Sequence, residues 1–208
     1  MTTPTAKRIS EDEFNALTRD AQAIEQDSHG IKVFELPDSE YLKLFRRKRL
    51  LSSALLTPYS VRFWNNAERL MALGIPTVTP LELYRLPKTG WTAVRYRALD
   101  GQTLKSIYQP GQPLPEGLLE QLAALFRELH AKGVYFRSLH LGNVVLTPEG
   151  ELGLIDIADM RFQRRRLSRG QAKRNLAHFE RYLRYNGHSD DFPMDELRVL
   201  TLAPPAKR

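Results

Sequence analysis

The residues whose types and spacing could do chemistry gather between Tyr135 and Asp156, in the string YFRSLHLGNVVLTPEGELGLID. The string predicts a polar turn, a short strand, a Pro-Glu-Gly turn and a second strand. This order places Asn143 and Asp156 side by side at the mouth of a hairpin. An amide oxygen and a carboxylate are hard ligands suited to Mg²⁺ that also carries substrate phosphates. An asparagine in a turn is often there for its backbone angles, but the neighbouring aspartate favours metal binding.

A run of basic residues follows this hairpin, and we expect four of its members to bind polyanions: Arg164, Arg165, Arg166 and Arg169. Guanidinium groups bind phosphate oxygens bidentately. A second basic cluster, residues 46–49, follows a predicted strand. Either cluster would suit a phosphorylated sugar or an anionic membrane leaflet, at about 1 kcal/mol per basic residue in the membrane case. The alternative is an ordinary solvated charged face.

Length and composition limit the classes of protein to consider. The 208 residues fit one medium domain or two small lobes sharing a cleft. Cysteine is absent, which excludes disulfides and thiolate metal sites. The N-terminal residues have no apolar signal-like region, and no run approaches the ~18 apolar residues of a membrane span. We therefore expect a soluble, intracellular protein, whose net charge of +7 favours polyanionic partners.

Hydrophobic periodicity predicts the elements that position these residues. A capping box at Ser10 begins a short helix. The predicted strands cover residues 21–26, 31–36, 40–45, 80–86 and 91–99, and the predicted helices cover 60–73, 118–131 and a segment reaching 182. In the third strand, Tyr41 and Lys43 share one face while Leu42 and Leu44 share the other.

These elements divide the chain into four parts. Residues 1–20 are expected to form an N-terminal helical extension and residues 21–100 a sheet lobe. Residues 101–188 are expected to form a helical lobe, followed by a tail over 189–208. The fold class is α+β.

Two sets of motifs resemble known proteins. Residues 136–143, FRSLHLGN, are similar to the kinase catalytic loop H-R-D-L-x-x-x-N, and residues 156–158 are similar to D-F-G. The strings YLKLFRRKRLLSSALLTPYSVRF, NNAERLMALGIPTV and FRSLHLGNVVL resemble the lipopolysaccharide core kinase family, which comprises Kdo and heptose kinases and their InaA-like relatives. The resemblance extends over roughly residues 21–182.

This resemblance implies a minimal two-lobed protein-kinase-like fold that uses ATP and Mg²⁺ to phosphorylate a lipopolysaccharide core sugar at the cytoplasmic face of the inner membrane. Lys43 falls where the family contacts the α and β phosphates, and Glu68 where it pairs with that lysine. Tyr41 stands over the expected adenine position. The catalytic and metal-binding positions correspond to Arg137, Ser138, Asn143 and Asp156.

Three departures from the kinase pattern bear on activity. Ser138 stands where kinases place the aspartate that accepts the acceptor's proton, a role worth ~10²–10⁴-fold in rate. The phosphate-covering loop is reduced to the Asp27–Gly30 turn, where Asp27 would repel phosphate. Tyr41 replaces a small residue and must either stack on the base or obstruct it.

Two other functions remain open at this point. A pseudokinase that binds nucleotide or a partner without turnover is favoured by Ser138. A basic nucleic-acid-binding protein is less favoured, because no reader motif is present. His140 is expected to be satisfied by backbone groups, and Asp159 is expected to cap the following turn rather than act as a second acid.

Overall fold

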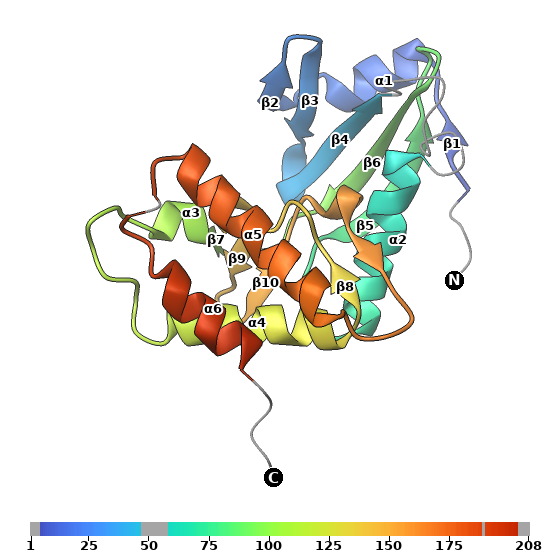
Figure 1. Ribbon diagram of the computed structural model, residues 1–208. Helices are drawn as coiled ribbons and strands as arrows, with labels where there is room; N and C mark the ends of the chain where they lie inside the picture. Colours follow the sequence, from blue (N-terminus) through green and yellow to red (C-terminus); the bar gives the residue numbers. More distant parts are fainter. Residues whose placement is uncertain (1–4, 47–57, 189, 204–208) are drawn as a thin grey trace. The chain divides into compact units, whose positions relative to one another are not determined.

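The computed structural model describes residues 5–46, 58–188 and 190–203 (Figure 1). Residues 47–49 of the second basic cluster lie outside this part of the chain. Contacts divide the chain into two compact units, residues 1–99 and 100–208.

A six-stranded sheet forms the centre of the first unit, in the order β1-β5-β6-β4-β3-β2. Its strands are β1 (Lys7–Arg8), β2 (Gln22–Asp27), β3 (Gly30–Glu35), β4 (Glu40–Arg46), β5 (Thr79–Arg85) and β6 (Trp91–Arg97). All neighbours pair antiparallel except β1 and β5, which are parallel. Five of these strands were predicted. The sixth, β1, has two residues and therefore leaves no alternation to detect.

The two faces of β4 differ as its alternation predicts. Leu42 and Leu44 are buried in a core that also contains Ile9 and Tyr84, with Phe14 of α1 (Glu11–Thr18) packed against it. Ser10 caps α1 in the predicted capping box with Glu13. Helix α1 therefore covers the leucine face.

Helix α2 (Tyr59–Ala72) covers the opposite face of the sheet. Its Phe63 lies 5.8 Å from Phe45 of β4 and 5.3 Å from Tyr96 of β6, measured between ring centroids. Phe45 shares its face with Lys43, so Lys43 belongs to the α2 side of the sheet.

The second unit combines helices with small sheets. Its helices are α3 (Leu104–Ile107), α4 (Leu118–Ala131), α5 (Arg169–Tyr185) and α6 (Met194–Leu202). Strands β7 (Gln102–Thr103), β9 (Val144–Leu146) and β10 (Leu152–Leu154) form a three-stranded sheet, and β8 (Val134–Tyr135) pairs with β11 (Arg161–Phe162). The α4 bounds are those predicted.

Helix α6 differs from the expected tail over residues 189–208. It buries Met194, Leu197 and Thr201, which are spaced by three and four residues and so lie on one face. This face packs against α4 and α5. The chain therefore keeps a core-forming helix close to its C-terminal end.

Candidate active site

Asn143 lies at the junction between a 3-10 turn (Leu141–Asn143) and β9. It is 7% exposed, and its Nδ2 donates a hydrogen bond to the backbone oxygen of Ser138 at 2.8 Å. Its own backbone oxygen accepts from Ile155 N at 3.0 Å, which joins it to the strand leading to Asp156. Because the amide nitrogen is held by Ser138, Oδ1 is the atom of this side chain that can ligate a cation.

Asp156 follows β10 and is exposed. It has φ 50° and ψ 47°, in the left-handed region. That region costs most L-residues roughly 1–2 kcal/mol, but Asp and Asn tolerate it better. Ile157 and Ala158 are buried directly after it and hold the turn in place. The antiparallel β9–β10 register thus brings Asn143 and Asp156 together, as the sequence predicts.

The loop that leads to Asn143 is held in place by contacts with helices α4 and α5. Phe136 and Leu139 are buried, and Asn175 of α5 donates to the backbone oxygen of Phe136 at 2.6 Å. Asn175 also forms a hydrogen bond with His130 of α4 at 3.2 Å. Burial lowers the pKa of His130, which favours the neutral ring in this contact. Asn175 was not among the residues predicted for the site, although its position among apolar residues of α5 indicates a buried polar group.

Ser138 forms a hydrogen bond that was not expected. Its Oγ donates to Oδ2 of Asp159 at 2.7 Å. Asp159 is the last residue of a 3-10 turn (Ile157–Asp159), and the expectation that it caps the following turn is wrong. Burial raises the pKa of the Asp159 carboxyl, and the charge of Asp156 adds to this effect, while Ser138 and Arg137 oppose it.

Arg137 and His140 have different surroundings in the same loop. Arg137 is exposed and acts electrostatically on Asp159. His140 accepts a hydrogen bond from Gly142 N at 3.1 Å through Nδ1, and its ring stacks on Tyr182 with centroids 4.2 Å apart. Burial lowers the pKa of His140. These contacts agree with the structural role expected for His140.

Three residues that the resemblance assigns to nucleotide binding lie in the first unit. Lys43 is half-buried on the α2 side of the sheet, and α2 carries Glu68. Trp64 Nε1 donates to Glu68 Oε1 at 2.9 Å. Tyr41 lies on the same face as Lys43, where it stacks on Tyr96 at 5.8 Å. The face therefore presents a lysine, an acid and an aromatic pair.

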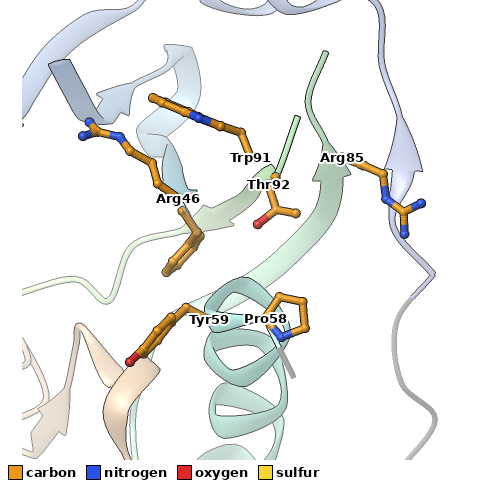
Figure 2. A pocket seen from close by; sticks show the side chains of 8 residues that line it. Arg46, Pro58, Tyr59, Arg85, Trp91 and Thr92 are labelled. Carbon is orange, nitrogen blue, oxygen red and sulfur yellow. The ribbon is translucent and has the colours of Figure 1, made fainter. Parts of the chain in front are cut away.

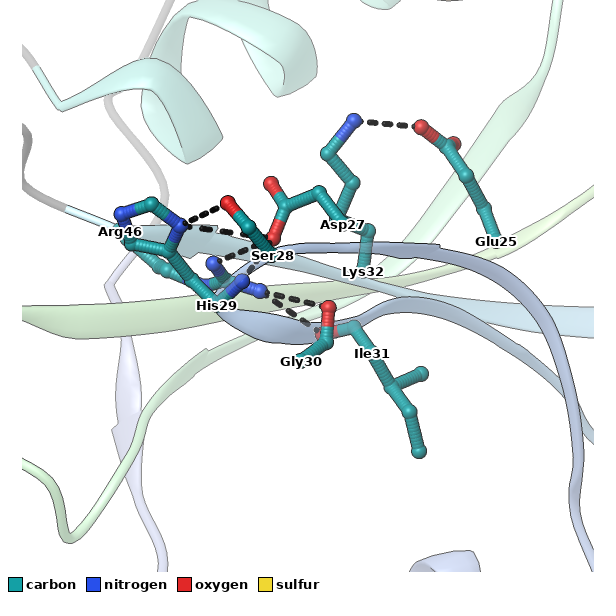
Figure 3. A network of polar contacts seen from close by, with 8 residues as sticks. All are labelled: Glu25, Asp27, Ser28, His29, Gly30, Ile31, Lys32 and Arg46. Atoms are coloured by element: carbon teal, nitrogen blue, oxygen red, sulfur yellow. Dashed lines mark hydrogen bonds and ion pairs between the residues drawn. The ribbon is translucent and has the colours of Figure 1, made fainter.

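The hairpin tip between β2 and β3 is braced by an arginine (Figure 3). Arg46 Nη1 donates to Asp27 Oδ1 at 2.9 Å, and Nη2 donates to the backbone oxygen of Gly30 at 2.9 Å. The backbone N–H of His29 also donates to Asp27, and this bond together with Arg46 lowers the pKa of the carboxyl. The negative charge expected to repel phosphate is thus offset by Arg46.

A cavity of about 390 Å³ lies at one end of the same sheet. Figure 2 shows the side chains that line it. It is lined by Phe45, Arg46, Pro58, Tyr59, Arg85, Gly90, Trp91 and Thr92. The Arg46 guanidinium lies 4.7 Å from the centroid of the Trp91 ring. Because Arg46 is already bound to Asp27 and to backbone oxygens, we assign this cavity no ligand.

The predicted polyanion-binding arginines are all exposed. Arg164, Arg165 and Arg166 lie between β11 and α5, and Arg169 is the first residue of α5. The backbone of this segment approaches Gly133, where an added Cβ would lie 2.5 Å from the Arg165 oxygen. Arg166 and Arg169 also line a groove with Arg127.

The oxygen atoms that the hairpin offers fit a magnesium ion better than they fit a metal whose ligands all come from the protein. Within residues 5–46, 58–188 and 190–203, no group of three or more His, Cys, Asp or Glu side chains could hold a metal. Asn143 and Asp156 could supply two oxygen ligands. Magnesium commonly takes one or two protein ligands and completes its octahedron with phosphates and water. Asn143 and Asp156 would hold such an ion.

The elements and the hairpin together define the class of the protein: it has an α+β, small protein-kinase-like fold. The model of the "Lipopolysaccharide kinase (Kdo/WaaP) family" matches residues 38–201, which is more than half of the chain. The chain belongs to this family, which confirms the resemblance seen in the motifs. No curated protein gives a significant match. Among the helices that the structure describes, none is long and apolar enough to cross a membrane.

Proposed function

We propose that this protein is an ATP- and Mg²⁺-dependent kinase that phosphorylates a sugar of the lipopolysaccharide core. The observation that carries the proposal is the pairing of Asp156 with an Asn143 carboxamide whose orientation is fixed by Ser138, in a chain of the lipopolysaccharide kinase family. The family membership supports the substrate class.

The proposed chemistry relies on positioning and charge. Phosphoryl transfer passes through a loose transition state with little covalent work for the protein. Lys43 would contact the α and β phosphates, and Glu68 would hold Lys43 in place. Asn143 and Asp156 would hold Mg²⁺, which when bound neutralises charge on the transferred group. Tyr41 would lie beside the adenine ring.

The exposed arginine segment supports an anionic acceptor. Arg164, Arg165, Arg166 and Arg169 would bind phosphate groups of the core or another phosphorylated glycan. The same residues would give peripheral contact with an anionic leaflet. Because the reaction consumes ATP, we place it at the cytoplasmic face of the inner membrane.

A pseudokinase is the second candidate, and Ser138 is the observation that favours it. A serine is a weak base, so a protein that binds nucleotide without turnover would tolerate it. The kinase and a nucleotide-binding pseudokinase both predict binding of Mg-ATP, whereas a partner-binding pseudokinase does not. Transfer of phosphate is predicted by the kinase alone.

The test is incubation of the native protein with γ-labelled ATP, Mg²⁺ and deacylated core oligosaccharide containing Kdo and heptose. We expect label in the oligosaccharide with the native protein and none with Asp156→Asn. Asparagine tolerates left-handed angles, so this blank removes a charge without straining the turn. Melting curves supply the binding arm, since a ligand at 100 times its Kd adds about 2.7 kcal/mol.

Three results separate the candidates. Transfer by the native protein alone supports the kinase. A melting shift with Mg-ATP and no transfer to any core fraction supports the pseudokinase. An unchanged melting temperature at saturating Mg-ATP would rule out the kinase and the nucleotide-binding pseudokinase, and would leave the partner-binding pseudokinase.

A further inference from the structure

The pair formed by Ser138 and Asp159 has no role in the function proposed above. The two residues are separated by 21 positions, and the fold joins them by a 2.7 Å hydrogen bond from Ser138 Oγ to Asp159 Oδ2. The backbone oxygen of Ser138 orients Asn143. The serine side chain therefore lies within the loop that carries the proposed metal ligand and connects it to a carboxylate.

The other oxygen of Asp159 is buried and unsatisfied. Within the described part of the chain, Oδ1 has no hydrogen-bond partner. A buried polar atom without a partner is energetically unfavourable and calls for an explanation. An under-solvated carboxylate is a better proton acceptor than a solvated one, because burial disfavours its charged form. The same burial raises the pKa of Asp159.

We propose that Asp159, acting through the hydroxyl of Ser138, supplies the carboxylate that position 138 lacks, and that the two together remove the proton of the acceptor sugar. This inference rests on the proposed function. Ser138 would touch the acceptor hydroxyl, and Asp159 would be the positioning residue behind it that receives the proton.

The step balances without any further reactant. The acceptor oxygen forms a bond to the γ-phosphorus of ATP as the bond from that phosphorus to the β,γ-bridging oxygen breaks, and ADP leaves. The acceptor's proton passes to Ser138 Oγ, and the Ser138 hydroxyl proton passes to Asp159 Oδ2. Asp159 ends the step as a neutral carboxylic acid and returns its proton to water.

A simpler role for the pair would be to hold the loop. Asp159→Asn separates the two roles, because an asparagine Oδ1 still accepts the Ser138 hydrogen bond but cannot take up the proton. If the pair only holds the loop, this variant keeps the rate. If the pair removes the proton, kcat falls by about 10²–10⁴-fold, the typical contribution of a general base.

The experiment measures transfer from labelled ATP to the same core oligosaccharide by native protein, Asp159→Asn, Ser138→Ala and the double variant Ser138→Asp/Asp159→Asn. We expect both single variants to lose kcat by that factor while the KM for ATP and the melting shift with Mg-ATP stay unchanged. The double variant returns a carboxylate to position 138 and should recover most of the kcat lost in Asp159→Asn. Ser138→Asp alone should give no gain, because two adjacent carboxylates would share one proton.

Several results would overturn the inference. A kcat within about threefold of native in Asp159→Asn leaves only a structural role and does not affect the proposed function. Loss in both single variants without recovery in the double variant shows that the carboxylate is not the base. If Asp159→Asn does not fold, native rate in Ser138→Ala would contradict the relay. Absence of transfer by the native protein would remove the proposed function and this inference together.

Discussion

His130 and Asn175 connect two helices to the loop that carries the site. Asn175 is fully buried and bridges His130 of α4 to the backbone of Phe136. The neutral His130 ring fits this environment, because burial lowers its pKa. The unfolded chain, with an ordinary pKa near 6.5, therefore binds a proton more readily. The stability that this pair contributes is present above about pH 6.5 and is lost as the pH falls through the folded pKa.

We expect the free energy of unfolding to decrease as the pH is lowered from about 7.5 to 5. The decrease is at most about 1.4 kcal/mol for each unit by which folding lowers the pKa of His130. The variant His130→Gln should show a smaller slope, measured by urea unfolding at several pH values. It still contains His140, whose pKa burial also lowers, so a residual slope is expected. Asp159 contributes with the opposite sign in both proteins. Equal slopes in the two proteins would contradict this account of His130.

At the scale of elements, α6 is a part of the core and not a tail. Leu197 is fully buried, whereas Val199 of the same helix is 69% exposed. Leu197→Ala should lower the free energy of unfolding by about 2–5 kcal/mol, the usual cost of a buried leucine. Val199→Ala is the matched control and should change it by less than about 0.5 kcal/mol. If chemical denaturation shows equally small effects for the two variants, α6 does not contribute to the core and the prediction is wrong.

Most elements of the fold could be predicted from the sequence because their signals are local. The alternation around Lys43 and the apolar stripe of α4 each identify one element. Helix α6 was missed because it is short and lies between prolines. The Asn143 and Asp156 pairing could also be predicted, since a hairpin brings near neighbours together. The Ser138–Asp159 bond could not, because it depends on how a 3-10 turn closes on a loop 21 residues away.

At the scale of the whole molecule, the net charge of +7 is concentrated in part at the exposed segment before α5. Changing Arg164, Arg165 and Arg166 to Glu should weaken binding to anionic vesicles or phosphorylated core by at least tenfold at low salt, while leaving the melting shift with Mg-ATP intact. The binding should also weaken as salt is added, because exposed charges are screened. Vesicle sedimentation at several salt concentrations measures both effects.

A matched control separates local from global charge. Lys7, Arg8 and Arg19 are exposed in the other unit, and their reversal changes the net charge by the same amount. We expect the control variant to keep most of the vesicle binding. Equal loss in both variants would show that the total charge, and not the segment before α5, attracts the anion.

Gly133 offers a way to sort relatives of this chain before any of their structures is known. It has φ 73°, and its Cα faces the backbone oxygens of Gln163 and Arg165. A relative whose basic segment follows the same path must keep glycine at this position, since even alanine would collide with that backbone. A relative with a larger residue there must route the segment elsewhere, and would therefore display its arginines on a different part of its surface.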